Sequence, residues 1–236
     1  MARAAKVWWG VVTFLCLLAS ALTFRIVAPG VSEGFLPALP RGLGAALHDF
    51  AVVGVREGLD HVFYHLPDRL AWLYLHMVFG TLSLMLLPLQ VAPRLRLRRP
   101  GLHRAAGRAM IGSVLIASAS SLPLAVNMEI PRWGIAGYVT GGVVWFVCGW
   151  MALVAALRRD VERHRRWALL TAAMTFGAVV LRIEFPIMRI WLSSDLTWAA
   201  VGWIGWMPQT LAVLVWLRRR ERARPRGVRP SAPRSA

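Results

Sequence analysis

The sequence predicts an all-α membrane protein, a polytopic transmembrane helical bundle of about six spans with both termini in the cytoplasm. Three observations predict this fold. Of the 236 residues, 57% are hydrophobic, whereas soluble domains are about 45–50% apolar. The apolar residues form runs of about 20, the length that a helix needs to cross a bilayer. The basic residues concentrate in every second connection between these runs, as the orientation rule for membrane proteins requires.

The predicted spans are the six apolar runs at roughly 7–28, 70–91, 109–126, 134–157, 167–191 and 198–216. The first contains Ala19-Ser20-Ala21, which resembles the cleavage site of a signal peptide. Because the run continues to Ala28, we interpret it as an uncleaved anchor. The spans make one domain, 1–217. The tail, 218–236, is rich in Arg and Pro and lacks apolar periodicity, so we expect it to be disordered.

The distribution of basic residues predicts the orientation. With the N-terminus inside, 21 of the 28 basic residues lie in the cytoplasm and four lie outside. The cytoplasmic set consists of two residues before the first span, six in 93–108, five in 158–166 and eight in the tail. This arrangement accounts for the net charge of +17 without a nucleic-acid partner. The expected contacts of the basic loops and the tail are anionic lipid headgroups.

The segment 29–69 is the largest predicted outer connection. Pro and Gly break its first half, and the second half, 45–66, mixes apolar and charged residues. That mixture predicts an amphipathic helix on the outer membrane surface. His61 and His65 are four apart and would share one face of this helix. Such spacing can bind zinc, but a lone H-x-x-x-H is weak evidence for a metal.

The strongest candidate site lies in the outer third of the membrane, where His76, Arg182 and Glu184 occur at similar predicted depths. They lie about 9, 13 and 10 Å below the outer ends of their spans. A central Arg or Asp costs about 2.5–3.5 kcal/mol on insertion, so such residues face the bundle interior and pair. Arg182 and Glu184 do not share a helix face. We therefore expect Arg182 to hydrogen-bond to the second span, through His76, or to line a water-filled pocket.

This site can bind a small anionic or carbonyl-bearing ligand, or relay protons. Pro186 adds to it, because a proline removes the hydrogen bond that the carbonyl of Arg182 would accept. Gln90 is a further polar residue of the second span and a candidate member, although such residues more often join helices. The alternative is a structural polar clamp between helices. The sequence contains no P-loop, G-x-S-x-G, H-E-x-x-H or dinucleotide fingerprint, so no enzyme class is predicted.

A second constellation lies on the cytoplasmic side. His103 and Arg104, with Arg108, open the third span, and His164 and Arg165 open the fifth. If these pairs meet, two imidazoles can ligate haem b, which would make the protein a b-type or quinol-linked electron carrier. The more ordinary interpretation is that these residues contact headgroups or neighbouring loops. A further alternative is a non-catalytic assembly or stability factor whose polar residues only join helices.

The fourth span contains three glycines on one face, Gly134, Gly137 and Gly141. Small residues at this spacing let helix backbones approach closely. We expect them to serve packing within the molecule rather than a dimer contact.

The residues of both sites fall on one pattern. Its parts are L-x-x-H at 73–76, P-x-Q at 88–90, H-R-x-x-G-R at 103–108, H-R-x-W at 164–167 and L-R at 181–182. Over roughly residues 70–190 the pattern resembles the uncharacterised bacterial integral-membrane family DUF2306. The resemblance implies a core of about four helices in the bacterial cytoplasmic membrane, and no established activity. The glycine that the family has before the proline of the second span is Leu87 here.

Overall fold

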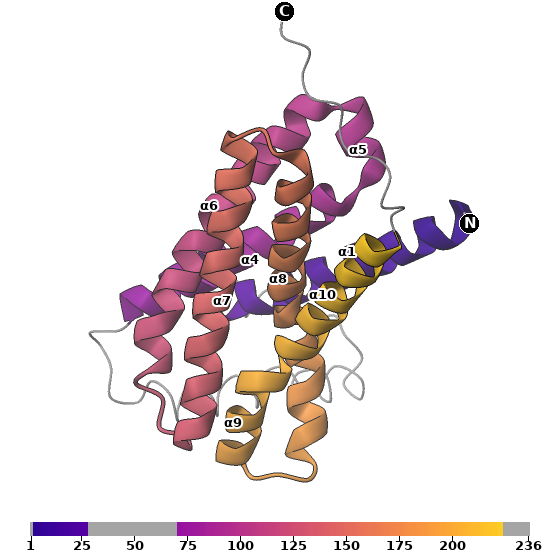
Figure 1. Ribbon diagram of the computed structural model, residues 1–236. Coiled ribbons are helices and arrows are strands. Elements are labelled where there is room, and N and C mark those ends of the chain that lie inside the picture. Colours follow the sequence, from indigo (N-terminus) through magenta and orange to yellow (C-terminus); the bar gives the residue numbers. More distant parts are fainter. Residues whose placement is uncertain (1, 28–69, 224–236) are drawn as a thin grey trace, which may run out of the picture.

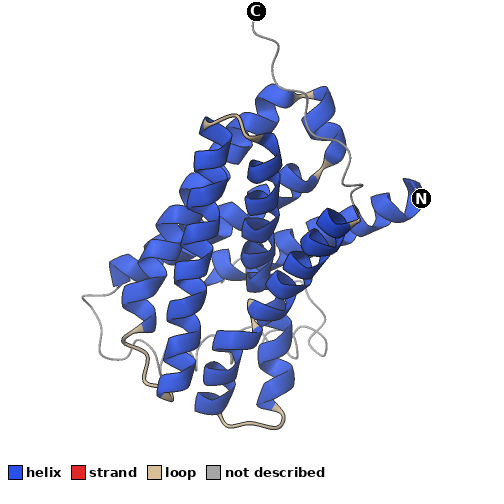
Figure 2. Cartoon of the chain, in the orientation of Figure 1, coloured by secondary structure: helices blue, strands red, loops and turns tan. Residues whose placement is uncertain are grey.

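The computed structural model describes residues 2–27 and 70–223 (Figure 1). Every regular element in these ranges is a helix (Figure 2), which confirms the predicted all-α class. The helices are α1 (Ala2–Val27), α4 (Leu70–Val91), α5 (Pro93–Arg98), α6 (Pro100–Ala125), α7 (Arg132–Leu157), α8 (Val161–Arg189), α9 (Ser194–Ile204) and α10 (Met207–Arg222). The predicted amphipathic helix with His61 and His65, and most of the tail, lie outside the described residues.

Five helical stretches are long and apolar enough to cross a membrane. They are Ala71–Val91, Pro100–Ala125, Arg132–Leu157, Val161–Arg189 and Ser194–Arg222. The N-terminal helix α1 contributes a shorter apolar stretch, Val7–Ala21. Large apolar side chains such as Ile116, Val147 and Trp150 are exposed on the outside of the bundle, as a lipid-facing surface requires. Crossing the membrane six times with both termini inside stays a prediction.

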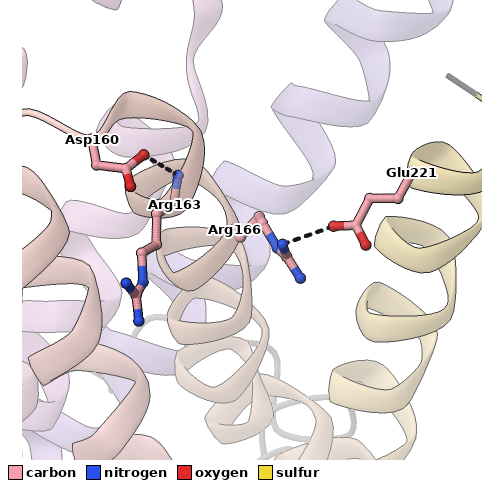
Figure 3. A network of polar contacts seen from close by, with 4 residues as sticks. All are labelled: Asp160, Arg163, Arg166 and Glu221. Carbon is pink, nitrogen blue, oxygen red and sulfur yellow. Dashed lines mark hydrogen bonds and ion pairs between the residues drawn. The ribbon is translucent and has the colours of Figure 1, made fainter. Parts of the chain in front are cut away.

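The helices α6 and α8 begin earlier than the apolar pattern predicted, and they carry His103 and His164 on their first turns. Pro100 is the first residue of α6, a position where proline's missing N–H costs nothing. Asp160 caps α8, since its carboxylate accepts a 3.0 Å hydrogen bond from the backbone N–H of Arg163 (Figure 3). The predicted loops 93–108 and 158–166 are therefore largely helical.

The last predicted span, 198–216, is divided into α9 and α10. Pro208 stands at the start of α10 and has no N–H to donate to the preceding turn. Gly205 lies at the break and faces α8, where a β-carbon on Gly177 would be only 2.6 Å from its carbonyl oxygen. The division is thus a helix interruption packed tightly against α8.

The glycine face of α7 packs inside the molecule, as predicted. A β-carbon on Gly134 would lie 2.3 Å from the Cα of Ala199 in α9, and one on Gly137 would lie 2.8 Å from the backbone of Gly202. The indole N–H of Trp206 donates to the carbonyl of Gly202 at 2.8 Å. Small residues on α7 therefore bring α9 into close backbone contact.

The apolar core joins α1, α4, α6 and α8. Cys16, Leu84, Leu87, Met110 and Val179 are buried together. Leu87 is 2% exposed and so fills this core. The core holds α1 and α8 beside each other, and this arrangement determines the partners of Arg182.

Candidate functional site

His76 is held between three helices. Its Nδ1 lies 2.9 Å from the carbonyl oxygen of Ala117 on α6, and its ring stands edge-on to that of Trp145 on α7, with centroids 6.5 Å apart. A carbonyl oxygen only accepts hydrogen bonds, so Nδ1 carries the proton in this contact. A neutral ring then keeps a lone pair on Nε2, which is available to a ligand.

Arg182 joins α8 to α1. Its Nη1 donates to the carbonyl of Ala178 at 2.6 Å, and its Nη2 donates to the hydroxyl of Thr23. The expectation that Arg182 would hydrogen-bond to His76 is therefore wrong. Thr23 belongs to an apolar run and is not ionisable, so the sequence did not indicate it as a partner of Arg182. A threonine oxygen that faces α8 nevertheless satisfies a guanidinium.

His76 and Arg182 are still electrostatic neighbours. The charge of Arg182 acts on the imidazole of His76, although no hydrogen bond joins them. No acidic side chain among the described residues interacts with Arg182. A guanidinium has five N–H donors, and the two hydrogen bonds of Arg182 go to neutral oxygens. With respect to the described residues, this pair, called here the His76–Arg182 site, therefore has donor capacity to spare and a positive charge that no acid compensates.

Glu184 forms no described hydrogen bond with the His76–Arg182 site, and Gln90 lies away from it. Within the described part of the chain, the buried Oε2 of Glu184 has no hydrogen-bond partner. Gln90 lies almost four turns along α4 from His76, about 21 Å away. Its side-chain amide instead donates to the carbonyl of His103 at 3.3 Å. Gln90 therefore contacts the second candidate site, which contains His103, and not the first.

The second candidate site is formed where α6 and α8 begin. His103 lies within electrostatic range of Arg96, His164 and Arg104, so the histidines of the two predicted His-Arg pairs lie near each other. His164 Nδ1 lies 2.9 Å from the carbonyl oxygen of Ala152 on α7. His103 Nδ1 is buried, and no described residue bonds to it. We call this arrangement the His103–His164 site.

The arginines around the His103–His164 site point outward. Arg104, Arg108 and Arg165 are all exposed. No group of three or more His, Cys, Asp or Glu residues in the described ranges is arranged to hold a metal ion. The described residues thus offer no such cluster of metal ligands. Haem ligation differs, because it needs only two axial imidazoles.

The sequence interpretation missed the backbone partners of both histidines. The carbonyls of Ala117 and Ala152 lie inside regular helices, and no side-chain pattern marks them. The link between Trp145 and Thr175 was also missed, where the indole N–H donates to the hydroxyl at 3.1 Å. The occurrence of Thr175 in an apolar span was the one available indication.

The fold and these sites define a class of protein: an all-helical, multi-pass membrane protein with polar residues held between its helices. Within that class, the chain belongs to the DUF2306 family of predicted membrane proteins, whose model matches residues 73–217. The match extends beyond the predicted 70–190 to include α9 and α10 as far as Leu217, and it leaves out α1 with Thr23. No curated protein and no solved structure matches the chain.

Proposed function

We propose that this membrane protein binds a small anionic or carbonyl-bearing ligand at the His76–Arg182 site. The observation that carries the proposal is that no acidic side chain among the described residues compensates the charge of Arg182. The residue lies in a membrane-length helix and bonds to the neutral oxygens of Ala178 and Thr23. A buried cation without a counter-charge is costly. An anion that accepts from the remaining guanidinium donors would lower that cost.

Each residue has a distinct part in this proposal. Arg182 supplies positive charge and donors, and His76 offers Nε2 to a hydroxyl or acidic proton of the ligand. Pro186 leaves the carbonyl of Arg182 without its helical donor, because proline has no N–H. Proton relay is the other use of such a site. Ligand binding is favoured because Glu184, the nearest acid in sequence, is not connected to either residue in the described structure.

The test is an anion titration of the purified protein in nanodiscs. Acetate or chloride replaces the bulkier gluconate at constant ionic strength, and the midpoint of thermal unfolding is measured. We expect a saturable rise in the midpoint, since a ligand at 100 times its Kd stabilises by about 2.7 kcal/mol. The Arg182→Gln variant should lose this response. Arg189→Gln, which makes the same change at the end of α8, should keep it.

Two results would contradict the proposal. One is a wild-type protein whose unfolding midpoint depends on neither anion. The other is an Arg182→Gln variant that responds as the wild type does. A His76→Gln variant separates the two uses of the site, because glutamine retains hydrogen bonding but cannot exchange a proton at neutral pH. Anion binding should survive this change with reduced affinity.

The His103–His164 site supports a second candidate function, the ligation of haem b. Metal-ligating histidines usually donate their other ring N–H to a carbonyl or carboxylate, and His164 makes that contact to Ala152. His103 brings a buried ring nitrogen that no described residue occupies. The two rings lie within electrostatic range of each other. These three observations favour a bis-imidazole site over a purely interfacial one.

Absorbance tests this candidate directly. Protein purified in mild detergent from haem-replete cells should show a Soret band that shifts on reduction with dithionite. His164→Ala and His103→Ala should each abolish the band, whereas His76→Ala, near the start of α4, should leave it. A colourless wild-type preparation would remove haem ligation from consideration.

A further inference from the structure

A groove of about 280 Å³ lies between the start of α8 and the end of α10. We call it the α8–α10 groove. It combines positive charge with an apolar wall. Neither His103 nor His164 lines it, although Arg165 on its wall directly follows His164 in the chain. Its charged lining residues are Arg165, Arg166, Arg220, Glu162 and Glu221, and Trp216 and Leu217 form the apolar wall.

One ion pair joins α8 and α10 at the groove. Arg166 Nη1 and Glu221 Oε1 are 3.0 Å apart (Figure 3). The guanidinium of Arg220 lies 4.2 Å above the ring of Trp216, which holds it in place without neutralising it. Arg165 has no hydrogen bond or ion pair with any described residue. Two arginines from different helices therefore bring positive charge to one groove, while a third is already paired.

We propose that the α8–α10 groove binds the phosphodiester headgroup of an anionic membrane phospholipid. Guanidinium groups match the planar, bidentate geometry of phosphate oxygens. The lining contains three arginines and two glutamates, so it keeps a net positive charge that suits a headgroup with a net negative charge. Exposed arginines near an anionic leaflet already attract such lipids. The groove adds a fixed position for one of them.

The position of the groove along α10 assigns the phosphate to a lipid. The last candidate span, Ser194–Arg222, ends here, and its sequence changes from apolar residues to arginine after Leu217. Tryptophan and arginine together are typical of the level where headgroups meet hydrocarbon. Leu211 and Val215, earlier on α10, are both exposed. An acyl chain can follow them while its headgroup lies in the groove.

Native mass spectrometry of protein released from nanodiscs tests the proposal. The discs contain phosphatidylcholine with or without an equal part of phosphatidylglycerol. Wild-type protein should retain phosphatidylglycerol in preference to phosphatidylcholine. The double variant Arg165→Gln/Arg220→Gln should bind it about 25-fold more weakly, as expected from about fivefold for each arginine near an anionic surface.

The matched control is Arg218→Gln/Arg219→Gln, which removes the same charge from residues that do not line the groove. This variant should retain the lipid nearly as well as wild type. Equal loss in the two double variants would show diffuse attraction and overturn the proposal. A second arm adds inorganic phosphate to lipid-depleted protein in detergent. Saturable phosphate binding that the groove variant loses, without preference for phosphatidylglycerol in discs, would assign the groove to free phosphate and also overturn the proposal.

Discussion

Arg182 on α8 donates a hydrogen bond to the hydroxyl of Thr23 on α1, and that hydroxyl donates in turn to the carbonyl of Ala19 at 2.9 Å. The two side chains therefore depend on each other unequally. Without Thr23, a buried guanidinium loses an acceptor. Without Arg182, the hydroxyl proton of Thr23 still has its own partner. This asymmetry gives opposite expectations for the two single substitutions.

Thr23→Val should destabilise the protein. Valine keeps the shape of threonine but leaves one guanidinium N–H without an acceptor, which costs about 1–3 kcal/mol. For a chain of this size that corresponds to about 2–4 °C in the unfolding midpoint for each kcal/mol. Thr13→Val is the matched control, since Thr13 lies in the same helix and is involved only in an exposed bond to Trp9. Equal loss in both variants would place the effect in α1 itself rather than in the contact with Arg182.

Arg182→Leu should retain the wild-type stability or exceed it. The change removes a buried charge and leaves no hydroxyl proton unpaired, and replacing a buried ion by an apolar residue is often neutral or stabilising. A purely structural clamp predicts the reverse, a clear loss of thermal stability. The same variant should lose the anion response described above. A fall of several degrees in the unfolding midpoint would favour the clamp.

The double variant Thr23→Val/Arg182→Leu tests whether these two effects share one contact. If they do, Thr23→Val should cost little once the guanidinium is gone, so the double variant should be more stable than Thr23→Val alone. The coupling measured by this double-mutant cycle should be at least 0.5 kcal/mol. Additive effects would show that the two residues act independently.

Gly134→Ala should disrupt the packing of α7 on α9. The new β-carbon would lie 2.3 Å from the Cα of Ala199, and a backbone atom cannot move aside as a flexible side chain can. We expect a loss of about 1–3 kcal/mol or more. Gly112→Ala in α6 is the control, because nothing lies within 4 Å of its β-carbon position. Its stability should be unchanged or up to about 1 kcal/mol higher. Unchanged stability in Gly134→Ala would contradict the close contact.

The membrane fold could be predicted from the sequence because its two requirements are visible there. Apolar runs of span length and glycines at small-residue spacing both leave patterns, and α7 with Gly134, Gly137 and Gly141 follows both. The residues at which α6 and α8 begin could not be predicted from such patterns. Arginines interrupt the apolar pattern without interrupting the helix, and the caps that begin these helices are local features around Pro100 and Asp160.

The candidate sites were only partly predictable. Charged residues inside apolar runs identified His76 and Arg182, since the cost of burying them is a property of the residue type. Their partners depend on how helices rotate and cross. The carbonyl of Ala117 and the hydroxyl of Thr23 became partners through packing among α1, α4, α6 and α8. Gln90 was grouped with His76 only as a further polar residue of the same span, and the length of α4 separates the two residues.

The last prediction concerns orientation in the membrane. The sequence places the Arg-rich connections in the cytoplasm, and Figure 1 shows α5 and the turn after α8 at opposite ends of the bundle. Leu97 in α5 and Trp191 after α8 are 77% and 82% exposed. Both native cysteines, Cys16 and Cys148, are buried, so they give a low labelling background. A single cysteine introduced at either exposed position therefore reports its own side.

In intact cells, a membrane-impermeant maleimide should label the Trp191→Cys variant. It should label the Leu97→Cys variant only after the membrane is permeabilised. The physical reason is the bias of 21 basic residues against four, because positively charged connections are retained in the cytoplasm. Val161→Cys, at the exposed start of α8, is a second cytoplasmic position and should behave as Leu97→Cys does. Labelling of Leu97→Cys and Val161→Cys from outside, with Trp191→Cys protected, would reverse the orientation. Arg182 would then lie near the inner surface, and the ligand at the His76–Arg182 site would have to enter from the cytoplasm.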